Sequence, residues 1–305
     1  MFSFELEPYS QGHSLDTDSP PFGEAVRIRT FMQFSAIGMG VLLLSSISTA
    51  MIGGVPIGNK VSVFFGGCSG TLIRPNLILT AGHCLYGPDL KRKADYYYRA
   101  NGPIVVTGYG GSDFAFGKMV FATKIVKTEV HPTWKHALNS QNGPLSADSA
   151  ADEPNVADVG IIVLKDKIPL ETAQLPVENF LASAQLETPL LNTGSGCQQR
   201  NAEMTAGVLK ASLLPIKEIL AQRLRLGTND EITKAAAGPC KKDSGGGSFY
   251  MHQNGNKDVW TVVAVNSIMA ATAEQAVADE PTEVYVTRLD RAIVLSWLET
   301  FTNGE

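Results

Sequence analysis

The segment CKKDSGGGSF, residues 240–249, places Ser244 directly before three glycines. Two roles fit that composition. Runs of glycine and serine form mobile tethers. A serine on a tight turn can instead act as a nucleophile, provided that a neighbouring base removes its proton. Neutral imidazole has a suitable pKa for that step, so a nucleophilic Ser244 requires a well-placed histidine elsewhere in the chain.

One histidine lies in a constrained setting. His83 directly precedes Cys84 at the end of CSGTLIRPNLILTAGHC, a segment that begins at Cys68. Two strands that return on each other would let these cysteines bridge and would pin the turn that carries His83. The alternative is that His83 has a purely structural role. A zinc site is disfavoured because the cysteines lack the paired C-x₂-C spacing, so we expect no metal.

Short apolar runs broken by glycine, proline and asparagine dominate the chain after residue 60. Their number and β-branched character predict an all-β protein of antiparallel barrels or sandwiches in two halves, joined around residues 170–189. Helices are predicted at 217–226 and 289–301, where apolar residues recur at intervals of three and four. The strands are predicted within residues 61–65, 70–73, 77–81, 104–109, 122–130, 159–165, 208–216, 259–267 and 283–289.

The N-terminal residues differ from the rest of the chain. Two arginines precede residues 30–59, which carry no charge and include small residues up to Ala50. This pattern predicts a secretory signal that is cleaved after Ala50, although an uncleaved membrane anchor also fits an uncharged run. Glycines and serines dilute the run and favour cleavage. We therefore expect an extension with a signal peptide over 1–50, one domain over 51–305, and a secreted or periplasmic protein without stable membrane association.

Composition excludes several function classes. The formal net charge is −5, and no basic block provides a nucleic-acid surface. The chain has no P-loop and no dinucleotide fingerprint, so we expect no cofactor. In an oxidising compartment the 4 cysteines predict two disulfides, for which three connectivities exist.

Three segments resemble the trypsin/chymotrypsin family of serine proteases, in the family's order. The segment that ends at His83 is similar to CGGSLI…LTAAHC, residues 155–165 (NVADVGIIVLK) are similar to DIALLKL, and CKKDSGGGSF is similar to C-x-GDSGGP. The resemblance covers about residues 51–301. It implies two antiparallel Greek-key β-barrels, over about 60–170 and 185–290, and a C-terminal helix over about 289–301. It also favours the nucleophile over the tether.

The resemblance implies a catalytic role for three residues. Ser244 is the expected nucleophile, His83 its base, and Asp158 the group that holds the His83 tautomer and stabilises the imidazolium. Asp158 could instead cap a turn. Two rival aspartates, Asp113 and Asp152, fit less well because neither precedes an apolar strand.

Other positions near the nucleophile match or depart from the family pattern. The main-chain N–H groups of Ser244 and Lys242 are expected to form the oxyanion hole, although the family usually has glycine at position 242. A side chain there crowds the leaving group or disfavours the required peptide orientation. Gly247 replaces the usual proline and predicts a looser loop. A new amino terminus at Met51 would pair with Asp243 in the manner of the family.

The resemblance also guides the disulfide prediction. The matched spacing implies that Cys68 pairs with Cys84. The family's usual partner for Cys240 is missing, and Cys197 follows a segment that lies beside the nucleophile loop in the family, so we expect Cys197 to pair with Cys240.

The expected substrate pocket is shallow and uncharged. Gly238 stands where trypsin has an aspartate, so a substrate Arg or Lys would enter unpaired unless Glu283 reaches in. Ser267, which also resembles the serine that binds the aspartate, lies at the pocket, with Met269 and Val284 as its walls. Ala or Val should fit, and Leu also if the flexible methionine moves aside.

The sequence therefore predicts a monomeric secreted serine endopeptidase that acts on proteins or peptides through an acyl-enzyme, after small uncharged residues. The alternative is a catalytically inactive, protease-like binding module.

Overall fold

The structure of the protein is a computed structural model. It describes residues 55–56, 61–85, 101–109, 118–138, 155–196, 209–228, 238–240, 242–254, 257–270 and 283–303. The chain divides between Ile47 and Ser48 into two units, and every described residue belongs to the second unit. No helix among these residues is long and apolar enough to cross a membrane. The predicted signal segment lies outside them.

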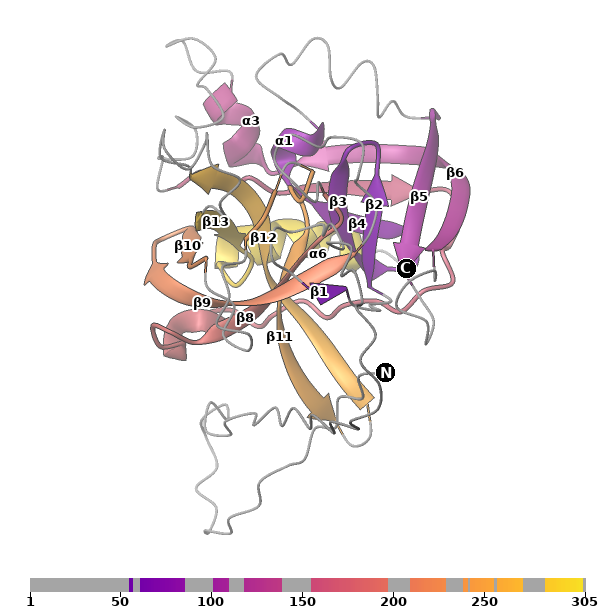
Figure 1. The fold of residues 1–305 in the computed structure, drawn as a ribbon. Coiled ribbons are helices and arrows are strands. Elements are labelled where there is room, and N and C mark those ends of the chain that lie inside the picture. The colour runs from indigo at the N-terminus through magenta and orange to yellow at the C-terminus, as the bar shows by residue number, and fades with distance from the viewer. Residues whose placement is uncertain are drawn as a thin grey trace, which may run out of the picture. The chain divides into compact units, whose positions relative to one another are not determined.

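The first half of the described chain is a closed barrel with the strand order β2-β3-β4-β7-β6-β5 (Figure 1). All neighbouring strands are antiparallel, and β2, β3 and β4 follow each other directly in the ring. Buried aliphatic and aromatic side chains, among them Phe65, Leu72 and Trp134, form its core. The strands are β2 (Ser62–Phe65), β3 (Cys68–Arg74), β4 (Leu77–Thr80), β5 (Pro103–Tyr109), β6 (Lys118–Val130) and β7 (Gly160–Leu164).

The second half is also a ring of six antiparallel strands, β9-β10-β13-β12-β11-β8, which the β8–β9 pairing closes. The short strand β1 (Val55–Pro56) adds to the free side of β9. Leu214, Ile216, Leu224 and Leu226 contribute to its core. The strands are β8 (Pro189–Gly194), β9 (Lys210–Ile219), β10 (Arg223–Leu226), β11 (Gly247–Asn254), β12 (Lys257–Ala270) and β13 (Glu283–Arg288). The predicted fold of two antiparallel barrels is confirmed.

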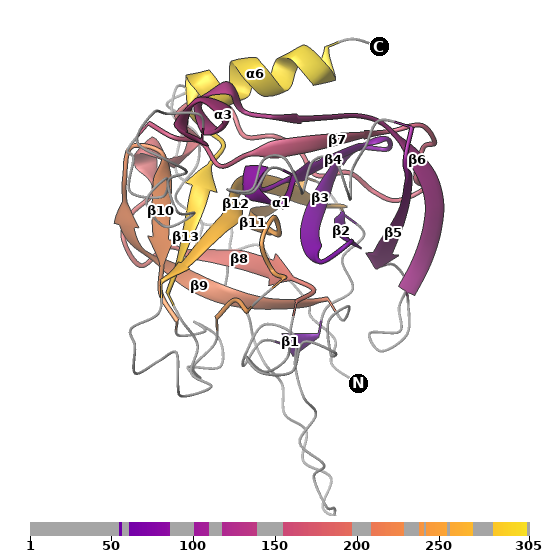
Figure 2. The ribbon, with the colours of Figure 1, turned by 90° about the horizontal axis from the view of Figure 1, so that it is seen from above.

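A third apolar cluster joins the two barrels. It combines Leu79 and Ile161 of the first barrel with Phe249 and Val265 of the second. The C-terminal helix α6 (Ala292–Thr302) buries Val294 and Leu298, one turn apart, in the same cluster, and Figure 2 shows the helix along one side of the two barrels. Because burial of apolar area is the main favourable term in folding, this shared cluster fixes the barrels against each other.

The predicted C-terminal helix is confirmed, whereas the helix predicted at 217–226 is wrong. There the chain forms the end of β9 and all of β10. In β10 Leu224 and Leu226 alternate with arginines, a period-two pattern that places both leucines in the barrel core. The other helical elements are short: α1 (Gly82–Leu85), α3 (Pro132–Leu138) and the 3₁₀ turn η1 (Phe180–Ser183). The sequence did not predict these three elements, or strands β1, β8, β10 and β11.

Candidate active site

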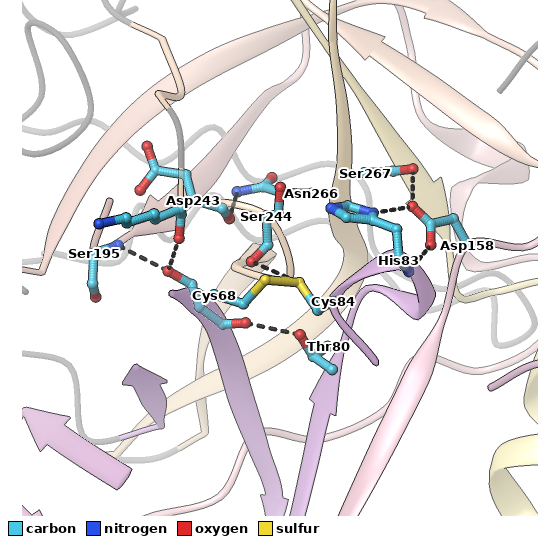
Figure 3. The surroundings of a disulfide bond; sticks show 12 residues. Cys68, Thr80, His83, Cys84, Asp158, Ser195, Asp243, Ser244, Asn266 and Ser267 are labelled. Atoms are coloured by element: carbon cyan, nitrogen blue, oxygen red, sulfur yellow. Dashed lines mark hydrogen bonds and ion pairs between the residues drawn. A yellow bond between two sulfur atoms is a disulfide. The ribbon is translucent and has the colours of Figure 1, made fainter. Parts of the chain in front are cut away.

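His83 lies on the one-turn helix α1, directly after β4. The predicted disulfide between Cys68 on β3 and Cys84 is present and ties this turn to the neighbouring strand (Figure 3). The His83 side chain is 21% exposed, so one edge of its ring remains accessible. The disulfide and the short helix thus hold a partly exposed imidazole at the edge of the first barrel.

Asp158 is fully buried just before β7, and its carboxylate accepts three hydrogen bonds. His83 donates from its main-chain N–H to Oδ1 at 2.8 Å, and its ring Nδ1 lies 2.7 Å from Oδ2. The Ser267 hydroxyl, from β12 of the second barrel, donates to Oδ2 at 2.6 Å. Gly82 packs closely against this pair, since a Cβ there would lie 3.0 Å from Asp158 Oδ1 and 2.9 Å from Trp134.

The environment of Asp158 keeps its carboxylate ionised. Burial by itself raises the pKa of Asp158, but the charge on His83 and the hydrogen bonds from His83 and Ser267 outweigh burial and lower the pKa below its usual value. A carboxylate held in this way fixes the His83 ring with Nδ1–H toward Asp158, which leaves Nε2 free to accept a proton.

Ser244 lies on a tight turn before β11, and close packing of the turn explains the glycines of its segment. Gly245 has a φ of +84°, and a Cβ there would lie only 2.1 Å from Thr80 Oγ1. Gly247 pairs with Val265, and a Cβ there would approach Thr71 Oγ1 to 2.7 Å. The looser loop predicted from Gly247 is therefore wrong, since the glycine is paired and closely packed. The segment is an ordered turn and not a tether.

The turn presents Ser244 toward His83. Figure 3 shows the Ser244 side chain on the side of the His83 ring that faces away from Asp158. Among the described residues, no hydrogen bond joins the Ser244 hydroxyl to the His83 ring, and the Ser244 N–H has no acceptor. Such nucleophile–base bonds are often long in the free protein and shorten when substrate binds.

Asp243 anchors the turn from inside the second barrel. Its carboxylate is fully buried and accepts hydrogen bonds from the N–H of Gly196 at 2.7 Å and of Cys240 at 2.6 Å. Burial raises the pKa of Asp243 to about 7, and these two hydrogen bonds oppose the rise. Gly194 leaves room for the side chain, because any Cβ there would clash with the Asp243 carboxylate. Met51, the predicted source of a partner amine, lies outside the described residues.

Lys242 adopts a left-handed backbone with a φ of +75°. For a non-glycine residue this conformation costs about 1–2 kcal/mol. The Ser69 hydroxyl of β3 donates to the Lys242 carbonyl at 3.0 Å, while the Ser69 N–H donates to the Ser244 carbonyl at 2.9 Å. Sequence reasoning identified Lys242 but missed Ser69, although the signal was available: Ser69 replaces the first glycine after the cysteine of CGGSLI.

Asn266 is a second residue that the sequence analysis missed. Its side-chain amide is buried and donates to the Asp243 carbonyl at 3.2 Å and to the Thr193 carbonyl at 3.1 Å. Asn192 donates to Asn266 Oδ1 at 2.5 Å and to Ser248 at 2.8 Å, so the buried amides satisfy each other. A lone asparagine within the apolar run VVAVNS was the available signal.

The predicted pocket residues lie in different settings. Gly238 is buried, Ser267 binds Asp158, and Val284 packs in the core of the second barrel. Met269 pairs with Val284 through the main chain. The side chains of Met269 and Glu283 lie outside the described residues, so the pocket stays a prediction.

The second predicted disulfide is described only at one end. Cys240 is disulfide-bonded, but Cys197 lies outside the described residues, as do Asp113 and Asp152. The Cys197–Cys240 pairing therefore stays a prediction. Within the described part of the chain, no group of three or more His, Cys, Asp or Glu residues could hold a metal ion.

The protein consists of two six-stranded antiparallel barrels, with a His–Asp pair on the first and a serine turn on the second. This arrangement is that of the trypsin-like fold. The family profile described as Trypsin matches residues 48–288, so the chain belongs to the trypsin family and is a trypsin-like serine protease domain. A search of curated proteins gave no significant match. Proteases of this family act on proteins and peptides and are commonly secreted.

Proposed function

We propose that the protein is an active serine endopeptidase with Ser244 as nucleophile, His83 as general base and Asp158 as the residue that orients His83. The observation that carries the proposal is the pairing of His83 with a buried, ionised Asp158 beside the Ser244 turn. A serine hydroxyl is a weak nucleophile at neutral pH, so an adjacent imidazole of fixed tautomer is what hydrolysis needs.

The proposed reaction proceeds in two halves. Nε2 of His83 takes the Ser244 proton as the hydroxyl oxygen attacks the peptide carbonyl carbon, and the imidazolium then protonates the leaving amine. The remaining acyl ester on Ser244 is attacked by water, whose proton passes to His83, and Ser244 departs as the hydroxyl. The main-chain N–H groups of Ser244 and Lys242 would bind the oxyanion, each donor contributing about 3–4 kcal/mol where such donors have been tested.

We also propose that cleavage follows small uncharged residues. The support is chemical: Gly238 supplies no carboxylate to pair with a substrate Arg or Lys, and unpaired burial of a charge is unfavourable. A peptide library cleaved after Ala or Val would agree, whereas preference for Arg, Lys, Phe or Tyr would contradict the proposed pocket. Secretion as a monomer after cleavage at Ala50 belongs to the same proposal.

The alternative is an inactive binding module. Two observations among the described residues favour it: the backbone of Lys242 is strained, and no hydrogen bond joins Ser244 to His83.

A fluorophosphonate probe separates the two functions. We expect the probe to label the wild-type protein and Ser244→Ala to abolish both labelling and peptide hydrolysis. Ser248→Ala is the matched control, because Ser248 is a buried serine of the adjacent strand β11 whose hydroxyl accepts a hydrogen bond from the Asn192 side chain. Absence of labelling in folded wild-type protein, or activity that persists in Ser244→Ala, would reject the proposal.

A further inference from the structure

Ser69 contacts the turn of the proposed nucleophile through two polar atoms, its main-chain nitrogen and its hydroxyl oxygen. Its N–H donates to the Ser244 carbonyl at 2.9 Å, and its hydroxyl donates to the Lys242 carbonyl at 3.0 Å. The same hydroxyl accepts the Ser195 N–H at 3.0 Å. A single buried residue of the first barrel therefore holds two carbonyls of a turn that belongs to the second barrel.

The Ser69 hydroxyl is held in place before it acts on the turn. Thr80 on the adjacent strand β4 donates to the Ser69 carbonyl at 2.9 Å, and the disulfide at Cys68 fixes the preceding residue (Figure 3). The hydroxyl oxygen accepts a hydrogen bond from the Ser195 N–H, and its hydrogen points toward the Lys242 carbonyl. Preorganisation of this kind lowers the entropy that the hydrogen bond must offset.

Lys242 is the residue of the turn that needs such support. Its φ of +75° lies in a small left-handed region that residues with a Cβ leave readily unless their surroundings hold them. A return to negative φ rotates the chain after the Lys242 Cα relative to the chain before it, which moves the Lys242 carbonyl away from the Ser69 hydroxyl. The hydrogen bond is therefore specific to the left-handed conformation.

We propose that the Ser69 side chain is a positioning residue that keeps Lys242 left-handed, and thereby keeps the Lys242 N–H directed at the oxyanion. The inference rests on the proposed function. Ser69 and Lys242 stand where the family segments CGGSLI and C-x-GDSGGP have glycine. In this proposal the two residues act as a coupled pair. A glycine at 242 would not need the serine hydroxyl, since glycine adopts positive φ without strain.

A double-mutant cycle tests the coupling. Ser69→Ala is compared in the wild-type background and in the Lys242→Gly background, by kcat and KM on a chromogenic peptide and by affinity for a peptide boronic acid, whose adduct is tetrahedral. With Lys242 present, we expect Ser69→Ala to lower kcat and boronate affinity about tenfold while KM changes less than about twofold. With Lys242→Gly, the loss should be less than about twofold.

Ser62→Ala is the matched control. Ser62 is also a buried serine of the first barrel, and its hydroxyl contacts the second barrel at Thr193. It should keep kcat within about twofold at a similar change in thermal stability. Ser69→Gly serves as a second variant if Ser69→Ala does not fold.

The outcomes are distinct. Equal losses in both backgrounds, or no loss in either, would overturn the role of Ser69 while leaving the proposed function intact. A folded wild-type protein that neither hydrolyses peptides nor binds the probe would reject the proposed function and this inference with it.

Discussion

Asp158 and Asp243 are both 0% exposed, yet their pKa values move in opposite directions. Burial raises the pKa of each carboxyl. At Asp158 the charge of His83 and hydrogen bonds from His83 and Ser267 reverse that effect. At Asp243 two main-chain N–H groups oppose it only in part, and the pKa rises to about 7. The partners of a buried carboxyl, and not its burial alone, decide its protonation state.

The difference matches two tasks. In the proposed mechanism His83 accepts and returns a proton in each turnover, and such a base needs a permanent negative charge beside it, which Asp158 would supply. The Asp243 carboxyl instead accepts hydrogen bonds from main-chain N–H groups of two segments, and its pairing with an amine at Met51 stays a prediction. Among the described residues, one region is thus organised around charge and the other around main-chain hydrogen bonds.

The largest expected effect comes from removing the charge at Asp158. In Asp158→Asn the amide can donate to His83 Nδ1 and favour the wrong tautomer, so kcat should fall about 10³–10⁴-fold with the fold retained. Steady-state kinetics on protein titrated for active sites measures the loss. Asp166→Asn, which alters a carboxyl of the first barrel bound to Thr123, should leave kcat unchanged. A loss below about tenfold at Asp158 would contradict the assigned role.

The second effect concerns stability and pH. The pKa of Asp243 is about 7 in the folded protein and 3.8 in the reference state, so the folded protein binds more protons between these values. The contribution of Asp243 to the free energy of unfolding is therefore fully present below pH 3.8 and is lost as the pH rises through about 7. The contribution is on the order of 4 kcal/mol.

Urea unfolding at pH 5 and pH 8 measures this dependence, with Ser244→Ala in every sample to prevent self-digestion. Asp243→Asn should remove most of the decline in unfolding free energy between the two pH values. An equally steep decline in Asp243→Asn would show that the carboxyl is already ionised at pH 5, and the contrast with Asp158 would fail.

The smallest expected effect is at Ser267. Ser267→Ala removes one of the hydrogen bonds that lower the pKa of Asp158 but leaves those from His83. We expect kcat/KM to fall about tenfold, because hydrogen bonds to charged groups contribute about 1.5–3 kcal/mol and part of that is recovered by relaxation. The acid limb of the pH–rate profile should move as well. An unchanged pH–rate profile would show that His83 alone keeps Asp158 ionised and that the Ser267 hydrogen bond does not contribute.

Local apolar patterns predicted the all-β halves and the C-terminal helix. The two barrels and the roles of His83, Asp158 and Ser244 were predicted from the resemblance to the trypsin/chymotrypsin family, because each of these three residues also fits a structural role in its local sequence. The period-two pattern of the strands is local. The strand β10 was mistaken for a helix because four residues are too few to separate the two periods.

Other features depend on contacts between distant segments, and the local sequence marks such residues as unusual without showing their partners. Ser69 stands where CGGSLI has glycine, but its contacts are known only once the turn at Lys242 is placed against it. Asn266 interrupts an apolar run, but its partners Asn192 and Asp243 come from elsewhere in the chain. The raised pKa of Asp243 comes from its burial, which exists only in the folded barrel, and the N–H groups of Gly196 and Cys240 oppose the rise.

The hydrogen bond from Ser69 to Lys242 spans 173 residues of chain, and that from Ser267 to Asp158 spans 109. Contacts of such long range form slowly, because a large loop must close before they contribute. During synthesis His83 and Asp158 are both added to the chain well before Ser244. The growing polypeptide therefore lacks the proposed nucleophile until late, and the complete site requires the second barrel to close against the first.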